Sequence, residues 1–600
     1  MANKISLGRY MWERPGSQPP RIHQIGVNSI FGVPGDFNLQ FLDSIFDVDG
    51  LEWVGNQNEL NAAYAADGYA RVKGVPGCLV TTHGVGELSA LNGIAGSMSE
   101  HIPIIHVVGQ TTRAMQKNHM MIHHSIGQKP DHQQYNKASV PLRSAAAELW
   151  DVETAPGEID RVIKECVVNS LPVYVFLPLD LSAEMVDVEL LKTPIDLRPN
   201  FDKEKQSEAV EAIAEALKAA KHPVLLVDVL TKRFGAAAET RHLAERLKVP
   251  FFSSNMGKGI VDETEEMYGG VWMGAVSSPG VLDEVKKADL VLTLGYLPAD
   301  TNSGGFSRNL TEATTIRIDP HEVIVKGHQY SGIAMRPLLS ALLKTLPEKP
   351  QHTVEKPTLS ESRIPKDKDE KNSHNHTSGV GKDDVLLGET GTSNFGIYDI
   401  PFPSNLQYEA QIYYGSIGWA TAATFGADVA HRERLKSAKK DGGRTVLFTG
   451  DGSLALTIQE IGSMVKNKSK CVIFIINNEG YTVERMIWGA RQVYNDIVPT
   501  SYEHLLPLYK HPDPDHSYHR VTTKEEFDAV LQKPQVVNPE IVQLVELVVE
   551  KLDTSWRLGA QLAVRGGEAR KYLKEEGFHD AYGSWGLSEE AMGGTGVSWK

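Results

Sequence analysis

The chain has 600 residues, of which 41% are hydrophobic, enough for about two to four domains with cores of their own. Its formal charge of −15 repels polyanions, so we expect no nucleic-acid partner. No run approaches the roughly 20 apolar residues of a membrane span, and the N-terminal residues lack the apolar stretch of a signal peptide. We therefore expect a cytoplasmic protein without a membrane partner. The three cysteines, Cys78, Cys166 and Cys471, are far apart in sequence and indicate neither a disulfide framework nor a zinc site.

Short apolar runs alternate with helix-like stretches in three parts of the chain, which is typical of parallel βαβ units. In the first part we expect strands at 28–33, 51–54, 77–82 and 102–108, and helices at 39–46, 59–72 and 87–99. The alternation returns at 223–229, 236–247, 250–252 and 288–294, and again at 445–449, 454–465 and 471–476. The fold class is therefore α/β, with three α/β domains built on parallel sheets.

The composition also indicates where the domains end. We expect domains over residues 1–190, 191–347 and 384–556, separated before the third by a polar linker, 348–383, that holds almost no large apolar side chains. Residues 557–600 are an atypical C-terminal tail rich in Gly, Glu and Ala, expected to lie at the periphery with one helix near 568–576.

The third domain contains the most informative pattern. The segment GDGS, Gly450–Ser453, follows one apolar strand, and the segment NNEG, Asn477–Gly480, follows the next. Asp451 and Asn478 are 27 residues apart, which fits a strand, a helix and a return strand, and a right-handed crossover sets both strand ends at one edge. Their oxygens are ligands that Mg²⁺ prefers, and the adjacent glycines let backbone amides approach a diphosphate. A lone GDGS is more often an ordinary turn, so the spaced pair carries this hypothesis.

The rival cofactor signatures are absent from the sequence. We find neither GxGxxG after a strand nor GxxxxGK[ST], which argues against nicotinamide cofactors and nucleoside triphosphates. GDGS followed by NN instead resembles the signature of the thiamine-diphosphate enzymes. The segments ETGTSNFG (389–396) and YGSIGW (414–419) are similar to those of the pyruvate decarboxylases within that family. This resemblance extends over roughly residues 5 to 555.

The resemblance implies thiamine diphosphate and Mg²⁺ as cofactors. It assigns Mg²⁺ to Asp451, Asn478 and the carbonyl group of Gly480. The cofactor-binding residues that it implies are Glu59, Thr392, Gly415, Ser416, Ile417, Asp451, Gly452, Ser453, Asn478 and Gly480.

Several residues acquire a chemical role only through the resemblance. Glu59, in NELNAAYAADGYAR, could simply favour the first turn of a helix, and Asp36, after GVPG, could be a helix cap. The family instead places such a Glu on the aminopyrimidine N1′ of the cofactor. The implied catalytic residues are Asp36, Glu59, His123, His124 and Glu484, and the implied substrate-binding residues are Asp36, His124, Thr390, Glu484 and Arg233. Imidazole and carboxylate groups suit proton transfer near neutral pH.

The implied reaction is the non-oxidative decarboxylation of a small 2-oxo acid, most simply pyruvate to acetaldehyde and CO₂, through the ylide of the cofactor. The chain would then be a carboxy-lyase that works as a homodimer or homotetramer with its sites at the subunit interface. The alternatives are an indolepyruvate or phenylpyruvate decarboxylase and a cofactor-binding homologue without activity. A carboligating synthase is disfavoured because synthases of this fold typically lack the histidine pair.

The chain departs from the family at several positions. Gln128–His132 replaces the usual Asn-Gly-Asp-Phe loop, Trp488 replaces a histidine, and Asn394 stands where relatives carry Ala and is expected to narrow the substrate pocket. Leu230–Arg233 stands where some members have a regulatory cysteine run. Arg233 is retained there, so we expect it to bind a carboxylate without covalent help.

Overall fold

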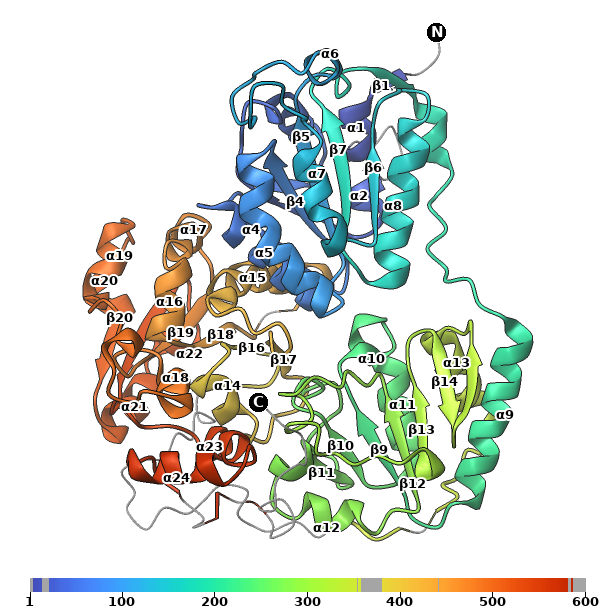
Figure 1. The fold of residues 1–600 in the computed structure, drawn as a ribbon, viewed down its shortest axis with the longest axis vertical. Helices are drawn as coiled ribbons and strands as arrows, with labels where there is room; N and C mark the ends of the chain where they lie inside the picture. Colours follow the sequence, from blue (N-terminus) through green and yellow to red (C-terminus); the bar gives the residue numbers. More distant parts are fainter. Residues whose placement is uncertain are drawn as a thin grey trace.

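The computed structural model describes residues 4–12, 21–352, 354–357, 380–440, 442–580, 584, 585 and 587. Most of the linker expected at 348–383, residues 353 and 358–379, and most of the tail beyond 580 lie outside the described residues. The described strands form three large, mostly parallel sheets and one small antiparallel pair, as the α/β prediction requires (Figure 1). None of the described helices has the length and apolar character needed to cross a membrane.

The first domain is built on a parallel sheet of order β3-β2-β4-β5-β7-β6. Its strands are β2 (Ser29–Gly32), β3 (Glu52–Trp53), β4 (Gly77–Thr82), β5 (Ile104–Gln110), β6 (Ala145–Glu148) and β7 (Val173–Pro178). The longer helices are α4 (Glu59–Lys73), α5 (Val85–Ser99) and α8 (Ala155–Asn169), and the shorter ones are α1 (Leu7–Trp12), α2 (Arg21–Gln24), α3 (Leu39–Asp43), α6 (Arg113–Lys117) and α7 (Gln134–Ser139). Separately, β1 (Lys4–Ser6) pairs antiparallel with β8 (Met185–Asp187).

The middle domain has a seven-stranded sheet of order β11-β10-β9-β12-β13-β14-β15. Its strands are β9 (Pro223–Val227), β10 (Phe251–Ser253), β11 (Tyr268–Val271), β12 (Leu290–Leu294), β13 (Thr315–Ile318), β14 (Glu322–Val325) and β15 (His328–Ser331). The sheet is parallel as far as β13, and the last two strands are antiparallel. Its helices are α9 (Lys203–Ala219), α10 (Leu230–Arg233), α11 (Ala237–Leu247), α12 (Val281–Val285) and α13 (Met335–Thr345).

The third domain repeats the topology of the first. Its parallel sheet has the order β17-β16-β18-β19-β21-β20, with strands β16 (Val385–Gly388), β17 (Gln407–Ala410), β18 (Thr445–Gly450), β19 (Cys471–Asn477), β20 (Tyr518–Val521) and β21 (Gln543–Val548). Its helices are α14 (Thr392–Ile397), α15 (Trp419–Ala438), α16 (Asp451–Thr457), α17 (Glu460–Lys466), α18 (Thr482–Ile487), α19 (Leu505–Leu508), α20 (Pro514–Ser517), α21 (Lys524–Leu531) and α22 (Pro534–Val537). The single helix expected at 454–465 is thus two helices.

Helices α4 and α15 join the first and third domains into one core, and Figure 1 shows them between the two sheets. Their backbones touch: a Cβ on Gly68 would lie 2.1 Å from the carbonyl oxygen of Ala423, and one on Gly426 would lie 1.8 Å from that of Ala65. Any larger side chain would push the helices apart. Both helices also begin close to residues that the sequence assigns to the site, since α4 starts at Glu59 and α15 follows Ile417.

The tail is less peripheral than its composition predicts. Two helices form, α23 (Trp556–Ala563) and α24 (Gly567–Glu575), so the expectation of one helix is wrong. Helix α23 is buried along most of its length because it packs against α14 and α18. Its Arg557 is fully buried and donates to Asp399 and to Ser278 Oγ, 3.2 Å away, which ties the tail to the third and middle domains.

Candidate functional site

The carboxyl end of the third-domain sheet positions the candidate site. The chain runs from β16 outward to β17 and then returns to β18 on the other side of β16, so the strand order reverses there. In open α/β sheets such a switch point leaves a crevice beyond the strand ends, where ligands bind. Asp451 follows β18 directly and Asn478 follows the neighbouring β19, as the 27-residue spacing predicts.

Three oxygens converge at this edge. Asn478 Oδ1 lies 3.0 Å from the carbonyl oxygen of Gly480 and 3.2 Å from Asp451 Oδ1, while Asn478 Nδ2 lies 2.8 Å from Thr482 Oγ1. An octahedral Mg²⁺ with bonds of about 2.1 Å has adjacent oxygen ligands about 3.0 Å apart. Turning the amide would instead let Nδ2 donate to both oxygens, so a cation and a turned amide are the two ways to satisfy this arrangement. The donor set therefore fits Mg²⁺.

The electrostatics of Asp451 agree with a cation at this position. Burial raises the pKa of Asp451 to about 6, although the N–H groups of Gly452 and Gly480 act in the opposite direction by donating to its carboxylate over 2.7 Å and 3.1 Å. A carboxyl group that is buried in this way is stabilised in its ionised form by a nearby positive charge. The Thr482 hydroxyl donates to the carbonyl of Lys551 at 3.1 Å, which leaves its oxygen free to accept from Asn478 Nδ2.

A small cavity of about 70 Å³ opens beside these oxygens. Its lining includes nine of the residues predicted from the sequence: Thr390, Thr392, Ile417, Asp451, Gly452, Ser453, Asn478, Gly480 and Glu484. Pockets for cofactors are typically about 300–1,000 Å³. The chain by itself therefore provides one side of such a site rather than an enclosing pocket.

Some contributors to this side were not predicted. Tyr481 lines the cavity, and its ring lies so close to Gly452 that a Cβ there would be 2.6 Å away. The buried Glu389 accepts hydrogen bonds from the N–H groups of Gly418 (3.1 Å) and Ala420 (3.2 Å) and so holds the start of α15. Burial raises the pKa of Glu389 to about 8. The signal for Glu389 was its place in ETGTSNFG, but its role depends on a contact that the sequence does not reveal.

The predicted residues Gly415 and Ser416 lie in the loop before α15 and do not line the cavity. The Ser416 hydroxyl is 2.6 Å from that of Tyr64 on α4 and 3.2 Å from Asn92 Nδ2 on α5. This loop is therefore held against the first domain of the same chain. Gly415 has a φ of +63°, in the left-handed region that favours glycine.

Asp36, His123 and His124 form a second group, at the edge of the first-domain sheet. Their ligand atoms lie within 4.8 Å of one another, and Asp36 Oδ2 is 2.7 Å from His123 Nε2. The two histidine rings are 4.6 Å apart, and Phe37 stacks on His123 with centroids 5.1 Å apart. The structure thus brings together three of the predicted acid–base residues, with a carboxylate positioned to orient one imidazole.

The loop Gln128–His132, which departs from the family, is anchored next to this group through His132. His132 is buried, its Nδ1 lies 2.8 Å from Thr111 Oγ1, and its Nε2 lies 3.0 Å from the carbonyl oxygen of Met120. Its ring also stacks on His83. Burial lowers the pKa of His83 to about 4, with the nearby histidines acting in the same direction, so His83 is neutral near pH 7.

Glu59 is the first residue of α4, where the Asn58 side chain caps the helix by accepting from the N–H groups of Leu60 (2.8 Å) and Asn61 (3.3 Å). A Cβ on Gly86 would lie 3.2 Å from Glu59 Oε1, so the carboxylate rests against the start of α5. This position suits both the helix-dipole interpretation and the family's role, and it lies in the first domain, like the histidine pair.

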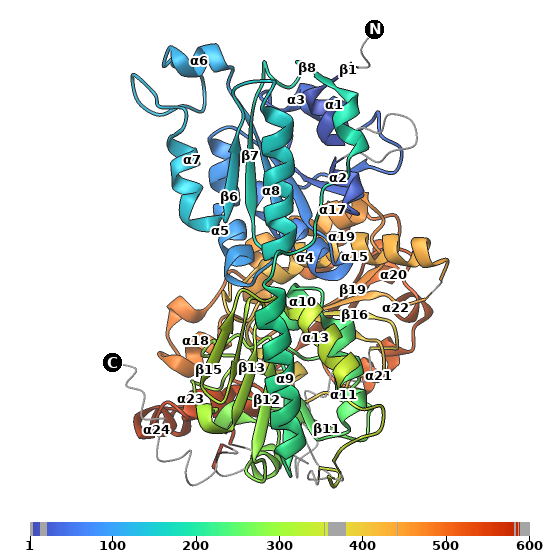
Figure 2. The same ribbon diagram turned by 90° about the vertical axis from the view of Figure 1, so that its right-hand side faces the viewer.

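The two groups are separated within one chain. None of the first-domain residues lines the third-domain cavity in the described part of the structure. Both views place α6, which precedes the histidine loop, at one end of the long axis and α18, which bears Glu484, well below it (Figures 1 and 2). The predicted site residues therefore form two groups in different regions of the chain, which we call the first-domain and third-domain half-sites.

Three other predicted or unusual residues lie elsewhere. The Arg233 side chain is 4% exposed and pairs with Glu409 (3.4 Å) beside a different, larger cavity, so the structure does not bring it to either half-site. Asn394 does not narrow the third-domain cavity, because its buried side chain accepts a hydrogen bond from Tyr408. Trp488 is 70% exposed and stacks on Tyr572 of α24, with ring centroids 5.6 Å apart.

Three family profiles of thiamine pyrophosphate (thiamine diphosphate) enzymes match the chain: the N-terminal TPP binding domain at residues 20–135, the central domain at 210–345 and the C-terminal TPP binding domain at 389–534. The chain is 40% identical over 562 residues to the pyruvate decarboxylase of Candida glabrata, covering 92% of this chain and 96% of that protein. It is 39% identical over 570 residues to pyruvate decarboxylase isozyme 1 of Saccharomyces cerevisiae, covering 93% and 98%. It is also 39% identical over 542 residues to the pyruvate decarboxylase of Aspergillus fumigatus, covering 89% and 93%.

Proposed function

The chain belongs to the thiamine pyrophosphate enzymes, as a member of the pyruvate decarboxylase group, and on that premise we propose that it converts pyruvate to acetaldehyde and CO₂ with thiamine diphosphate and Mg²⁺. The observation that most supports this proposal is the convergence of acceptor oxygens from Asp451, Asn478 and Gly480. These three residues would hold Mg²⁺. Gly452 and Ser453, at the start of α16, would lie against the diphosphate, with the Ser453 N–H as donor, since the Gly452 N–H already donates to Asp451.

When bound, thiamine diphosphate would supply an electron sink for the C–C bonding pair that stays behind when CO₂ leaves. The chain's own residues provide the proton chemistry. We assign Glu59 to the aminopyrimidine N1′, where a carboxyl group can hold or give up a proton. The carbon that loses CO₂ must then gain a proton before acetaldehyde departs. His123 and His124 are suited to deliver this proton near neutral pH. Asp36 Oδ2 lies 2.7 Å from His123 Nε2, where it can orient the imidazole and help to reprotonate it.

We propose a homodimer as the smallest active unit, with the first-domain half-site of one chain facing the third-domain half-site of the other. The separation of the half-sites and the small volume of the third-domain cavity support this arrangement. Closed two-fold dimers are the commonest assemblies of soluble proteins. The three buried free thiols suit a reducing compartment, and we place the enzyme in the cytoplasm.

One assay tests the reaction. Purified protein with thiamine diphosphate and Mg²⁺ is given pyruvate, phenylpyruvate or indolepyruvate, and aldehyde formation is followed through a coupled dehydrogenase. Faster turnover of pyruvate supports the proposal, and preferred turnover of the aromatic acids replaces it with the wider-pocket alternative. Binding of cofactor without aldehyde from any of the three acids would identify a homologue without activity.

Removing individual proton carriers should reduce turnover without preventing cofactor binding. We expect His124→Ala and Glu484→Gln each to lower kcat by roughly 10²- to 10⁴-fold, the usual effect of losing a general acid–base group. His504→Ala and Glu503→Gln, which make the same two changes at exposed positions of the third domain, are the matched controls. Losses below about threefold in both variants would move the proton chemistry to other residues.

The rate should not depend on accessible thiols. Cys78, Cys166 and Cys471 are all buried, and burial raises the pKa of each thiol above its usual range. We therefore expect mild alkylation of the folded protein to leave the curve of rate against pyruvate concentration unchanged, whether sigmoidal or hyperbolic. Mass spectrometry would verify that the thiols stay unmodified. A curve that changes shape on alkylation while the protein stays folded would contradict this prediction.

A further inference from the structure

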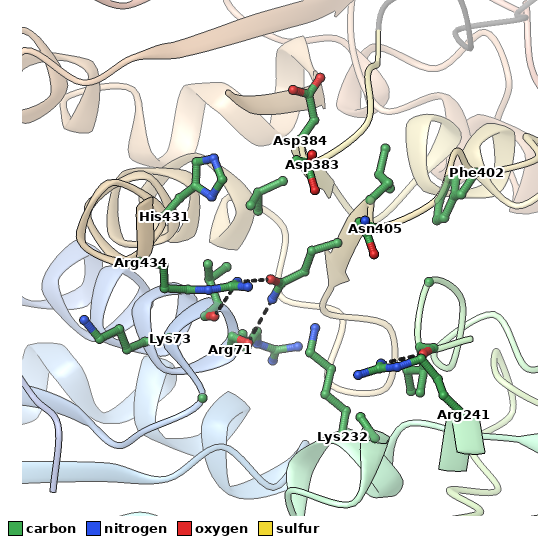
Figure 3. A pocket seen from close by; sticks show the side chains of 18 of the residues that line it. Arg71, Lys73, Lys232, Arg241, Asp383, Asp384, Phe402, Asn405, His431 and Arg434 are labelled. Atoms are coloured by element: carbon green, nitrogen blue, oxygen red, sulfur yellow. Dashed lines mark hydrogen bonds between the residues drawn. The ribbon is translucent and has the colours of Figure 1, made fainter. Parts of the chain in front are cut away.

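A second cavity, larger than the one beside Asp451, lies away from both half-sites, at the junction of the three domains. Its volume is about 890 Å³, within the usual range for sites of small organic ligands. The first domain contributes Arg71 from the end of α4, the middle domain contributes Lys232 and Arg241 from α10 and α11, and the third contributes Arg434 from the end of α15. Figure 3 shows these side chains converging from their different elements.

Several cationic side chains line one wall of the cavity, and two of them pair with the same carboxylate. Lys232 and Arg233 share a single partner, Glu409. Among the described residues, the acceptors of Arg434 are neutral: the carbonyl oxygen of Val72 (3.1 Å) and Gln407 Oε1 (2.5 Å). Burial lowers the pKa of Lys232 to about 8, and the neighbouring Arg233 and Arg434 act in the same direction while Glu409 opposes them. An added anion would stabilise these charges.

A buried donor also remains available. Arg71 is 3% exposed, and its Nε and Nη1 are engaged by Asp67 and by Glu100 and the carbonyl of Ala410. Its Nη2 has no acceptor among the described residues. In Figure 3 the Arg71 guanidinium points toward the end of Lys232. Guanidinium and ammonium groups arranged in this way are typical of phosphate recognition.

The opposite edge of the cavity carries acidic and amide side chains. Figure 3 shows the Asp383 carboxylate and the Asn405 amide there, away from Arg71 and Lys232; the Asp384 carboxylate beside them is already bound by Arg444. Carboxylates accept hydrogen bonds from hydroxyl groups but repel a second anion. A fitting ligand therefore carries its negative charge at one end and hydroxyl groups at the other. We propose that this cavity binds a phosphate monoester with a hydroxylated body, such as a sugar phosphate.

Such a ligand would contact both helices that lead to the half-sites. Arg71 lies third from the end of the contiguous helix that begins with Glu59, and Arg434 lies near the end of the helix that follows Ile417. Because it would touch all three domains at once, its binding stabilises their relative placement. This cavity is separate in position and in chemistry from the proposed diphosphate site at Asp451, Gly452 and Ser453.

The test uses the full chain saturated with thiamine diphosphate and Mg²⁺, so that the proposed diphosphate site is occupied. Ribose 5-phosphate, inorganic phosphate and ribose are titrated separately by calorimetry. We expect ribose 5-phosphate to bind at one site per chain, inorganic phosphate to bind more weakly, and ribose to give no heat. Arg434→Gln should weaken ribose 5-phosphate binding roughly ten- to hundredfold, as loss of a charge-assisted contact does. Lys436→Gln, which removes an exposed charge from the same helix, should leave binding unchanged.

Arg241→Gln is a second variant. The Arg241 guanidinium donates to the Ile260 carbonyl (2.9 Å) and so lies on another wall of the cavity. Thermal unfolding midpoints verify that each variant is folded. Absence of ribose 5-phosphate binding at millimolar concentration would overturn the proposal. So would affinity equal to that of inorganic phosphate, or affinity that neither Arg434→Gln nor Arg241→Gln changes.

Discussion

We expect Asp451→Ala to abolish activity at ordinary cofactor concentrations and to weaken the binding of thiamine diphosphate with Mg²⁺ by at least roughly 100-fold. Asp451 supplies one of three converging oxygens, and its carboxylate also accepts from the N–H groups of Gly452 and Gly480. The substitution therefore removes a proposed metal ligand and loosens the loop that carries the other two. A neutral methyl group cannot replace either interaction.

Calorimetry and thermal unfolding provide two independent measurements of this effect. A ligand present at 100 times its Kd stabilises the folded state by about 2.7 kcal/mol, so the unfolding midpoint of the wild type should rise when both cofactors are added. Asp451→Ala should lose that rise. Asp528→Ala, which removes an exposed carboxylate on α21 of the same domain, should keep it. Near-normal affinity in Asp451→Ala would contradict the assignment of the metal site.

The positions of the buried strands could be predicted because their apolar runs end in glycine or polar residues. Strand β4 was predicted at 77–82 and is observed at Gly77–Thr82, and β18 and β19 each extend one residue beyond their predicted ends. The break between α16 and α17 could not be predicted, because it serves a long-range contact. Glu460, at the start of α17, accepts from Asn56 and Asn61 of the first domain, each at 2.8 Å.

The proximity of Asp451 and Asn478 was predictable for a related reason. Asp451 and Asn478 each follow a strand directly, and adjacent parallel strands bring such residues together whatever the rest of the fold. The surroundings of the site were not predictable. Tyr64 reaches Ser416 across 352 positions of sequence, and the cations around the larger cavity come from three domains. No local sequence pattern predicts contacts of that kind. The buried position of Asn394 on α14 likewise depends on its hydrogen bond with Tyr408 of β17.

The other large effect concerns Glu59. We expect Glu59→Gln to bind thiamine diphosphate and Mg²⁺ but to slow exchange of the cofactor's C2 proton by roughly 10²- to 10⁴-fold, with kcat falling in parallel. Gln can hydrogen-bond N1′ but cannot hold and return a proton as a carboxyl group does. Because Glu59 stands at the first turn of α4, where Asn58 already caps the helix, the substitution should change stability little. Hydrogen–deuterium exchange at C2, measured by NMR after acid quench, tests the role directly, and exchange as fast as in the wild type would make Glu59 a structural residue.

Mixing this variant with Asp451→Ala tests whether one site uses two chains. In a mixed dimer with shared sites, one site carries both substitutions and the other carries neither, because Glu59 and Asp451 of a site come from different subunits. Random reassociation of equal amounts should then restore roughly a quarter of wild-type activity. If each chain instead completed its own site, every site in the mixture would still carry one substitution and no activity would return. The half-sites of this chain, with Asp36, Glu59 and the histidine pair on one domain and the proposed metal ligands on another, lead us to expect the first outcome.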